Sequence, residues 1–199
     1  VAPSGTEPCW ELADPGMTVI PIDFLNSNPD LTGTLKLGAA VKTIGYTAFF
    51  ETKLTSLDLS DAASLVSIGT NAFYNTDITG TLVIPSNVET IGWGAFLNTK
   101  LTGLDPSQAA SLVSIGANAF ADTDIAGTLV IPANVETIGE GAFQQTKLTG
   151  LDLSQAASLV SIGNFAFYDT DITGTIVMPP NVDIGPRNAF PSGVTIVTG

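Results

Sequence analysis

Carboxylates are the side chains of this sequence that could do chemistry, and they recur at a fixed interval. Asp58, Asp105 and Asp152 are spaced 47 residues apart, and so are Glu89 and Glu136. Paired carboxylates can hydrolyse glycosides and clustered ones can bind calcium. Repeat-equivalent residues two strands apart in a stack lie about 9–10 Å from each other, too far to share one ion at about 2.3–2.6 Å. We therefore expect a solvated acidic stripe.

The residues that other catalytic arrangements require are absent from the sequence. The chain has no histidine, which excludes Ser-His-Asp and Cys-His catalysis and imidazole metal sites. Its glycines follow the repeat and form no phosphate-binding motif. We predict that the protein is not an enzyme and has no cofactor or metal site. The one cysteine, Cys9, is either an incidental thiol in a terminal cap or a link to another chain or to further residues.

Charge and hydropathy limit the partners. The net charge is −13 with six cations, which argues against nucleic acid and against an anionic membrane surface. The 44% apolar content is sufficient for a packed core, yet no apolar run approaches the roughly 18 residues of a membrane span. We expect an acidic, soluble protein without direct membrane insertion. The first residue, Val1, suggests a processed or trimmed N-terminus.

A repeat organises residues 31–193 into seven units of alternating 23 and 24 residues, so the true period is a 47-residue pair. The units are Leu31–Lys53, Leu54–Asp77, Ile78–Lys100, Leu101–Asp124, Ile125–Lys147, Leu148–Asp171 and a shortened Ile172–Gly193. Such a period is typical of a solenoid, here a single domain. Residues 1–30 are expected to form an N-terminal cap with a degenerate first repeat, and residues 194–199 a C-terminal strand.

The third unit predicts how each repeat folds. Residues 81–84 alternate and end at Pro85, which indicates a short strand. The apolar residues Val88, Ile91 and Phe96 follow at spacings that suit a helical or 3₁₀ turn. The predicted fold is an α/β-type repeat solenoid with one short parallel strand per unit and short helical turns on the convex side. One phenylalanine column runs through it: Phe49, Phe73, Phe96, Phe120, Phe143, Phe167 and Phe190.

The unit resembles the BspA-like leucine-rich repeat family. Its pattern, L-x-x-L-x-I-P-x-x-L-x-x-I-G-x-x-A-F-x-x-C, is matched in order by Leu82, Ile84, Pro85, Val88, Ile91, Gly92, Ala95 and Phe96. Threonine replaces the cysteine of the family at Thr52, Thr76, Thr99, Thr123, Thr146 and Thr170. The inserted Ala62-Ala63 of the 24-residue unit implies that alternate rungs differ in shape. The resemblance implies a curved parallel solenoid, no catalytic residues, and an extracellular or cell-surface location with a protein or glycan ligand.

A column of alternating charge precedes the expected strands. It runs Asp30, Lys53, Asp77, Lys100, Asp124, Lys147 and Asp171. On a parallel stack these side chains are neighbours, so we interpret the column as a device that fixes strand register. The alternative is a zwitterionic stripe that binds a second copy, a mineral or ice. Two threonine columns flank it, one beginning at Thr52 and the other at Thr55.

The outward strand face is the candidate binding surface, because leucine-rich repeat proteins usually bind through this sheet. Its residues are Thr34, Lys36, Asp58, Thr81, Val83, Asp105, Thr128, Val130, Asp152, Thr175 and Val177. They are small, and the face should be smooth and poor in the aromatic and arginine residues that dominate tight interfaces. Trp93 is the candidate exposed aromatic contact, since it occupies a slot held by Glu140 in the equivalent unit.

Three functions follow from this pattern. The first is a non-catalytic recognition module that mediates protein or glycan binding and adhesion. The second is a structural subunit of a larger assembly or filament, and the third is ice or mineral binding through the threonine and charge columns.

Overall fold

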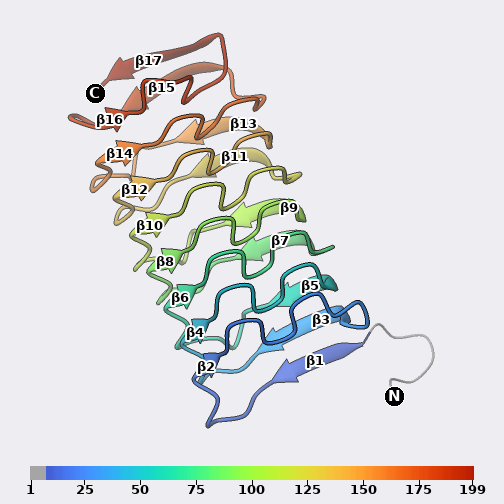
Figure 1. The fold of residues 1–199 in the computed structure, drawn as a ribbon. Helices are drawn as coiled ribbons and strands as arrows, with labels where there is room; N and C mark the ends of the chain where they lie inside the picture. The colour runs from blue at the N-terminus through green and yellow to red at the C-terminus, as the bar shows by residue number, and fades with distance from the viewer. Residues whose placement is uncertain (1–7) are drawn as a thin grey trace.

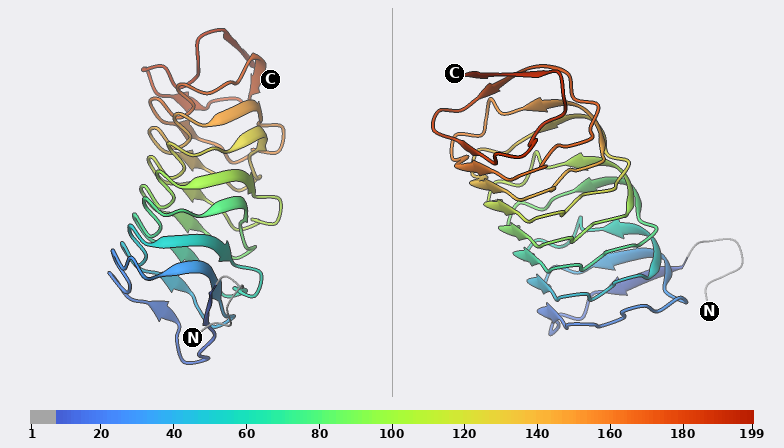
Figure 2. Two further views of the ribbon diagram at one scale, coloured as in Figure 1. Left: turned by 90° about the vertical axis from the view of Figure 1, so that its right-hand side faces the viewer. Right: turned by 45° about the horizontal axis from the view of Figure 1, so that its top comes forward.

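A computed structural model shows the chain as a solenoid, and it describes residues 8–199. The backbone winds through successive rungs that stack in parallel (Figure 1). Each rung before the last contains one long strand and one two-residue strand, and these lie on opposite sides of the stack (Figure 2). Residues 1–7, the start of the expected N-terminal cap, lie outside the described part. Residues 8–199 contain no helix long and apolar enough to cross a membrane.

The long strands carry the odd labels. They are β1 (Cys9–Leu12), β3 (Thr32–Leu37), β5 (Lys53–Asp58), β7 (Thr79–Val83), β9 (Lys100–Asp105), β11 (Ala126–Val130), β13 (Lys147–Asp152), β15 (Gly174–Met178) and β17 (Val194–Thr198). They pair in parallel, but only in small groups: β1-β3-β5, β7-β9, β11-β13 and β15-β17.

The short strands carry the even labels and form one continuous eight-stranded parallel sheet, in the order β2 to β16. They are β2 (Val19–Ile20), β4 (Thr43–Ile44), β6 (Ser67–Ile68), β8 (Thr90–Ile91), β10 (Ser114–Ile115), β12 (Thr137–Ile138), β14 (Ser161–Ile162) and β16 (Asp183–Ile184). Each contributes its isoleucine to the interior, and seven of the eight isoleucines are buried.

The expected single strand and helical turn per unit are therefore wrong. Residues 8–199 contain two strands per rung and no helix. Val88, Ile91 and Phe96 are buried as expected, but Ile91 lies in a strand and Phe96 in a turn. Their spacing of three to five residues resembles a helical period because two short extended segments and a turn bring side chains inward at similar intervals.

The turn around each phenylalanine from Phe49 to Phe167 is bonded to the next rung, which is why it is not helical. The N–H of Phe96 donates to the carbonyl of Ala119 at 2.8 Å, and the N–H of Phe120 donates to that of Ala142 at 2.8 Å. Left-handed residues bracket the turn, as at Asn118 and Asp122, with φ of 53° and 54°. Bonding to the neighbouring rung replaces the i→i−4 pattern of a helix.

The phenylalanine column fills the core. From Phe49 to Phe190 the rings stack face to face, with centroids 5.2–5.5 Å apart. In each rung from Phe49 to Phe167 a threonine hydroxyl donates to the phenylalanine carbonyl of its own rung, as from Thr99 to Phe96 at 3.0 Å. The hydroxyls of Thr52, Thr76, Thr123, Thr146 and Thr170 do the same. The family's cysteine position thus holds a polar group that bonds locally.

Close approach of neighbouring rungs explains the glycine that follows each isoleucine. A Cβ atom built on Gly116 would lie 2.6 Å from the backbone carbon of Gly92 in the preceding rung. No side chain fits into that space. The glycines are therefore required by packing between backbones rather than by a phosphate or a turn.

The alternation of unit lengths produces alternating strand shapes. Between β7 and β9 the register shifts after Gly80, because Gly80 pairs with Leu101 whereas Thr81 pairs with Gly103. Thr102 is left as the extra residue of a β-bulge, and β3/β5 and β11/β13 show the same shift. Bulges bend and twist the strand that carries them. The far edge of each bulged strand then fails to pair with the next long strand, so β5/β7, β9/β11 and β13/β15 are unpaired.

The terminal rungs continue the same architecture. At the N-terminal end β1 pairs with β3, and β2 pairs with β4. Phe24 contacts Phe49 edge-on, with centroids 6.2 Å apart, in place of the parallel stacking seen elsewhere. At the other end β17 pairs with β15 from Gly174↔Val194 to Met178↔Thr198.

Removing one ring from the stack should be costly. We expect Phe120→Ala to lower the free energy of unfolding by about 3–5 kcal/mol, because it leaves a cavity between two rings that cannot move together. The measurement is urea unfolding followed by circular dichroism. Val160→Ala, at an exposed side chain, is the control and should change stability by about 0.5 kcal/mol or less. Equal losses in the two variants would contradict a core built on the ring stack.

Candidate functional site

The outward strand face is divided by the three unpaired junctions. The register sets Lys36 beside Asp58, Val83 beside Asp105 and Val130 beside Asp152. Within each pair the strands are hydrogen-bonded, whereas at each junction the surface is hollowed. We call the hollows slot 1 (between β5 and β7), slot 2 (between β9 and β11) and slot 3 (between β13 and β15). Their volumes are about 760, 510 and 550 Å³.

The three slots are repeat equivalents and share eight lining residues. Each has a leucine, an aspartate, a serine and two alanines from one rung, and a threonine, a valine and a proline from the next. These are Leu57, Asp58, Ser60, Ala62, Ala63, Thr81, Val83 and Pro85 in slot 1, then Leu104, Asp105, Ser107, Ala109, Ala110, Thr128, Val130 and Pro132, then Leu151, Asp152, Ser154, Ala156, Ala157, Thr175, Val177 and Pro179. A surface expected to be smooth therefore carries three similar apolar depressions, each with one carboxylate.

Most of the predicted face residues meet at these slots. Ten of the eleven line a slot, with Thr34 joining slot 1. Lys36 lines no slot, although it lies beside Asp58 in the register; its ammonium pairs with Asp61 at 2.9 Å, and that contact raises the pKa of Lys36. Sequence reasoning missed the leucine, the serine, the two alanines and the proline as lining residues. The alanine pair inserted in every 24-residue unit was the signal that could have revealed them.

The slot aspartates are held by the turn that follows each strand. Asp105 Oδ1 accepts the N–H of Ser107 at 2.9 Å. The same bond joins Asp58 to Ser60 at 2.9 Å and Asp152 to Ser154 at 2.8 Å. Hydrogen bonds from the serine hydroxyl and N–H lower the pKa of all three carboxyls below the ordinary value of 3.8. The carboxylates are thus ionised and fixed in orientation, and Oδ2 has no backbone partner of this kind.

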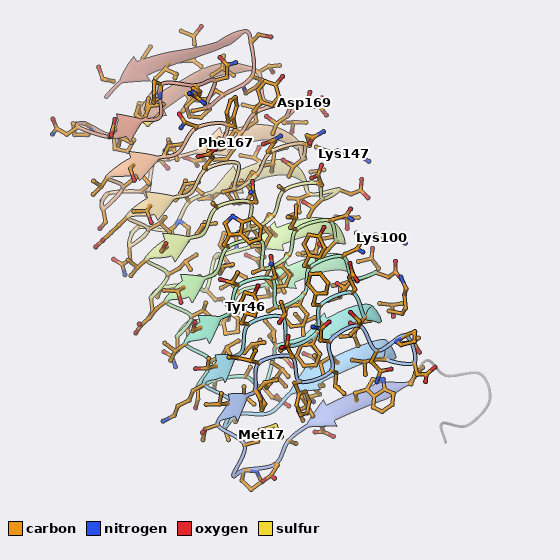
Figure 3. The ribbon with its side chains drawn as sticks, in the orientation of Figure 1. Met17, Tyr46, Lys100, Lys147, Phe167 and Asp169 are labelled. Carbon is orange, nitrogen blue, oxygen red and sulfur yellow. The ribbon has the colours of Figure 1, made fainter. Side chains whose placement is uncertain are left out.

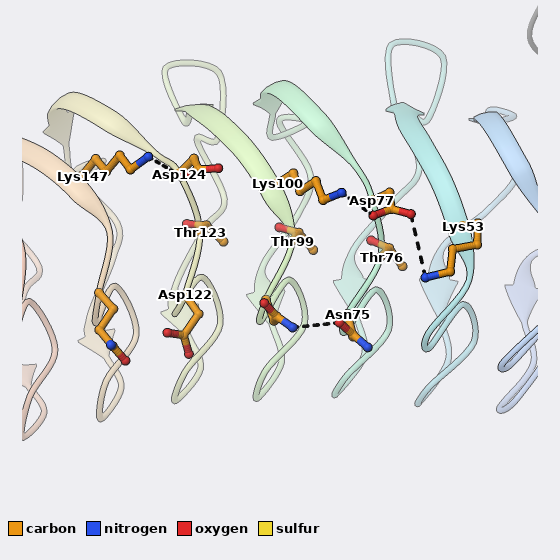
Figure 4. Close-up of a pocket in the computed structure, with 12 residues that line it drawn as sticks. Lys53, Asn75, Thr76, Asp77, Thr99, Lys100, Asp122, Thr123, Asp124 and Lys147 are labelled. Carbon is orange, nitrogen blue, oxygen red and sulfur yellow. Dashed lines mark hydrogen bonds and ion pairs between the residues drawn. The ribbon is translucent and has the colours of Figure 1, made fainter.

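The charge column forms a second, polar groove on the stack (Figure 4). Lys100 pairs with Asp77 at 2.7 Å, Lys53 approaches the same carboxylate at 3.9 Å, and Lys147 pairs with Asp124 at 2.6 Å. Lys100 and Lys147 project from the same edge of the stack, near the starts of β9 and β13 (Figure 3).

The groove holds about 390 Å³, and its charges largely neutralise one another. The ion pairs do not run continuously along the column. Two lysines share Asp77 and one pairs with Asp124, and among residues 8–199 no ion pair involves Asp30 or Asp171. Exposed pairs of this kind contribute about 0–1 kcal/mol each. The groove is therefore a weaker candidate than the slots, because its lysines already have partners.

Two other predicted features also have clear positions. The threonine column that begins at Thr52 is buried over five rungs, so it is not available to an ice or mineral surface. The second column is more accessible, with exposed side chains at Thr79, Thr102, Thr149 and Thr173. Trp93 is 44% exposed and lies outside the slots.

Comparisons with known proteins define the class. The chain belongs to the BspA-type leucine-rich repeat family: the profile "BspA type Leucine rich repeat region (6 copies)" matches residues 24–123 and 113–197. A comparison with curated proteins finds no match. Among solved structures the chain is similar to "The Crystal structure of Pneumococcal vaccine antigen PcpA", with 15% identity and a TM-score of 0.37 over 83% of this chain and 68% of that one.

The lowered pKa of the slot aspartates predicts a pH dependence. Because the folded-state pKa lies below 3.8, the ionised carboxylate stabilises the fold above about pH 4, and this contribution is lost as pH falls through the folded-state pKa. We expect Asp105→Asn to lower the free energy of unfolding at pH 7 by about 1 kcal/mol or less, since the amide oxygen still accepts a weaker bond. The difference from wild type should shrink toward zero near pH 2, by urea titration. Glu136→Gln, at an exposed carboxylate, is the control; a pH-independent difference would contradict the assignment.

Proposed function

We propose that this protein is a non-catalytic recognition module that binds a macromolecular ligand through slots 1–3 of its long-strand face. One observation carries the proposal: a hollow with the same eight lining residues occurs three times at 47-residue intervals on one face. Equivalent sites on a rigid stack allow one extended ligand to bind at several points, and the affinities then multiply. Family resemblance supports a secreted or cell-surface location for such a module.

The chemistry of the slots favours a polypeptide over a glycan. Their walls are leucine, valine and alanine, which suit apolar side-chain atoms. A sugar ring carries hydroxyl groups on its whole periphery, and each would need a partner on burial. Slot 2 supplies few side-chain polar groups, chiefly Asp105, Ser107, Thr128 and Gln155. A peptide segment satisfies this balance with fewer unpaired groups.

Filling the slots tests the function. The triple variant Ala63→Tyr/Ala110→Tyr/Ala157→Tyr places three rings over the hollows at exposed positions and should leave the core intact. We expect ligands detected on peptide and glycan arrays to bind this variant at least about tenfold more weakly than wild type, a loss of about 1.4 kcal/mol.

The matched control is Thr79→Tyr/Ala126→Tyr/Thr173→Tyr, at an exposed column with the same 47-residue spacing that lines no slot. It should bind as wild type does. A ligand that both variants retain, or the absence of any ligand on both arrays, would contradict recognition through the slots.

A second candidate function is assembly, favoured by the edge of β17. This strand pairs with β15 alone among the described strands, its sequence VTIVT is uncharged, and Ile196 and Val197 are 40% and 41% exposed. Uncharged apolar edges of this kind readily pair with another strand.

Light scattering against concentration separates assembly from recognition. If β17 mediates assembly, the mass of the wild-type protein should grow with concentration, and Ile196→Lys should stay monomeric because it places a charge on the edge. Cys9→Ser, measured under reducing and oxidising conditions, is the control for pairing through the exposed thiol. A wild-type protein that stays monomeric throughout would rule out this function.

A further inference from the structure

We propose that each slot binds the side chain of a lysine or arginine, and that the ligand is an extended basic polypeptide that occupies slots 1–3 together. This inference rests on the proposed function and names the chemistry of its ligand. It depends on three properties of the slots: apolar walls, one fixed carboxylate, and the absence of a competing cation among the described residues that line them.

The walls fit the aliphatic stem of a basic side chain. In slot 2 the stem would lie between Leu104 and Ala110 on one rung and Val130 on the next. Lysine and arginine bury such stems on apolar surface while the charged end stays near water. The open side of each slot lets the charged end remain solvated, so no full desolvation penalty arises.

The carboxylate is positioned to receive the charged end. Asp105 is fixed through Oδ1 by Ser107 and is ionised at neutral pH; the hydrogen bonds from Ser107 lower its pKa further. Its other oxygen has capacity to accept further bonds. No lysine or arginine is found among the described residues that line slots 1–3, and the nearby Lys36 is paired with Asp61. Asp105 and Asp152 therefore have no cationic side chain in their slots, and Asp58 has only the long-range influence of Lys36, so a cation supplied by a partner could pair with each slot aspartate.

The net charge agrees with a basic partner. A protein of charge −13 attracts cationic ligands at long range and repels acidic ones. Both effects weaken as salt screens the charges, so the affinity should fall with ionic strength. The aliphatic contacts within the slot distinguish this mode from a diffuse electrostatic attraction, because they depend on the slot and not on total charge.

The repeat sets the spacing of the basic residues. Adjacent slots are separated by two rungs, at least about 10 Å at the usual strand separation. An extended chain covers about 10 Å in three residues and about 13 Å in four. Basic residues four apart on an extended chain, or three apart on a polyproline II chain that advances about 9 Å per turn, lie on one side of the ligand and would reach the three slots in turn, whereas three adjacent basic residues would not.

Synthetic peptides test the inference directly. The probes are labelled Gly/Ser peptides with three arginines, placed at every third or at every fourth position. A peptide of equal length with one arginine is the reference. Fluorescence anisotropy in low salt gives the affinities. We expect the better three-arginine peptide to bind wild type at least about tenfold more tightly than the one-arginine peptide.

Two charge-matched variants decide between slot binding and general attraction. Asp58→Asn/Asp105→Asn/Asp152→Asn keeps an oxygen for the serine bond but removes the slot charges, and we expect at least about tenfold weaker binding. Asp77→Asn/Asp124→Asn/Asp171→Asn removes as much charge from the charge column and should change affinity less than about threefold. Circular dichroism melts check that both variants fold.

The outcomes are decisive. Equal loss in the two variants, or equal binding of the one-arginine and three-arginine peptides by wild type, would overturn the inference. Failure here is distinguishable from failure of the proposed function. A ligand that the slot-filled tyrosine variant loses but the slot asparagine variant retains would establish recognition through the slots and refute a cationic ligand.

Discussion

Hydrogen bonding between the backbones of successive rungs is the interaction on which the structure depends. It ties the turn at each buried phenylalanine to the next rung, as from Phe120 to Ala142, and it runs unbroken along the short strands. The rungs are thereby held so close that Gly116 cannot carry a side chain. At this separation identical rings stack at 5.2–5.5 Å, and the core becomes one continuous column that no single unit could bury alone.

The short-strand side and the long-strand side of the stack differ in how continuously their backbones are hydrogen-bonded. The short strands keep the ladder through all eight members, whereas the long strands keep it only in groups. Bulge residues such as Thr102 bend β5, β9 and β13, and none of these three strands pairs with the long strand that follows it. The lost strand pairing leaves a hollow, and the 47-residue period makes the hollow recur. The candidate binding surface is thus a consequence of the unit-length alternation.

Most buried threonines of the core and the three slot aspartates form hydrogen bonds to the backbone a few residues away in the same rung. Thr99 bonds the carbonyl of Phe96 within its own rung, which satisfies a buried hydroxyl without a partner from elsewhere. Asp105 bonds the turn two residues later. The charge column, by contrast, pairs between rungs but in exposed positions, where Asp77 is shared by Lys53 and Lys100. Only the slot aspartates have both a fixed orientation and an apolar hollow beside them. This is why the slots, and not the charge column, support a binding function.

The sequence by itself determined the repeat, its 47-residue period, the buried phenylalanine and isoleucine columns, and the outward position of residues such as Val83. Periodicity reports these features because equivalent positions in a stack share one environment. It did not reveal that Ile91 belongs to a second strand, since short extended segments joined by turns imitate a helical spacing. It also did not reveal the slots. Whether neighbouring strands pair depends on bulge geometry between two rungs, here between Gly80 and Thr102, and only the tertiary structure decides that.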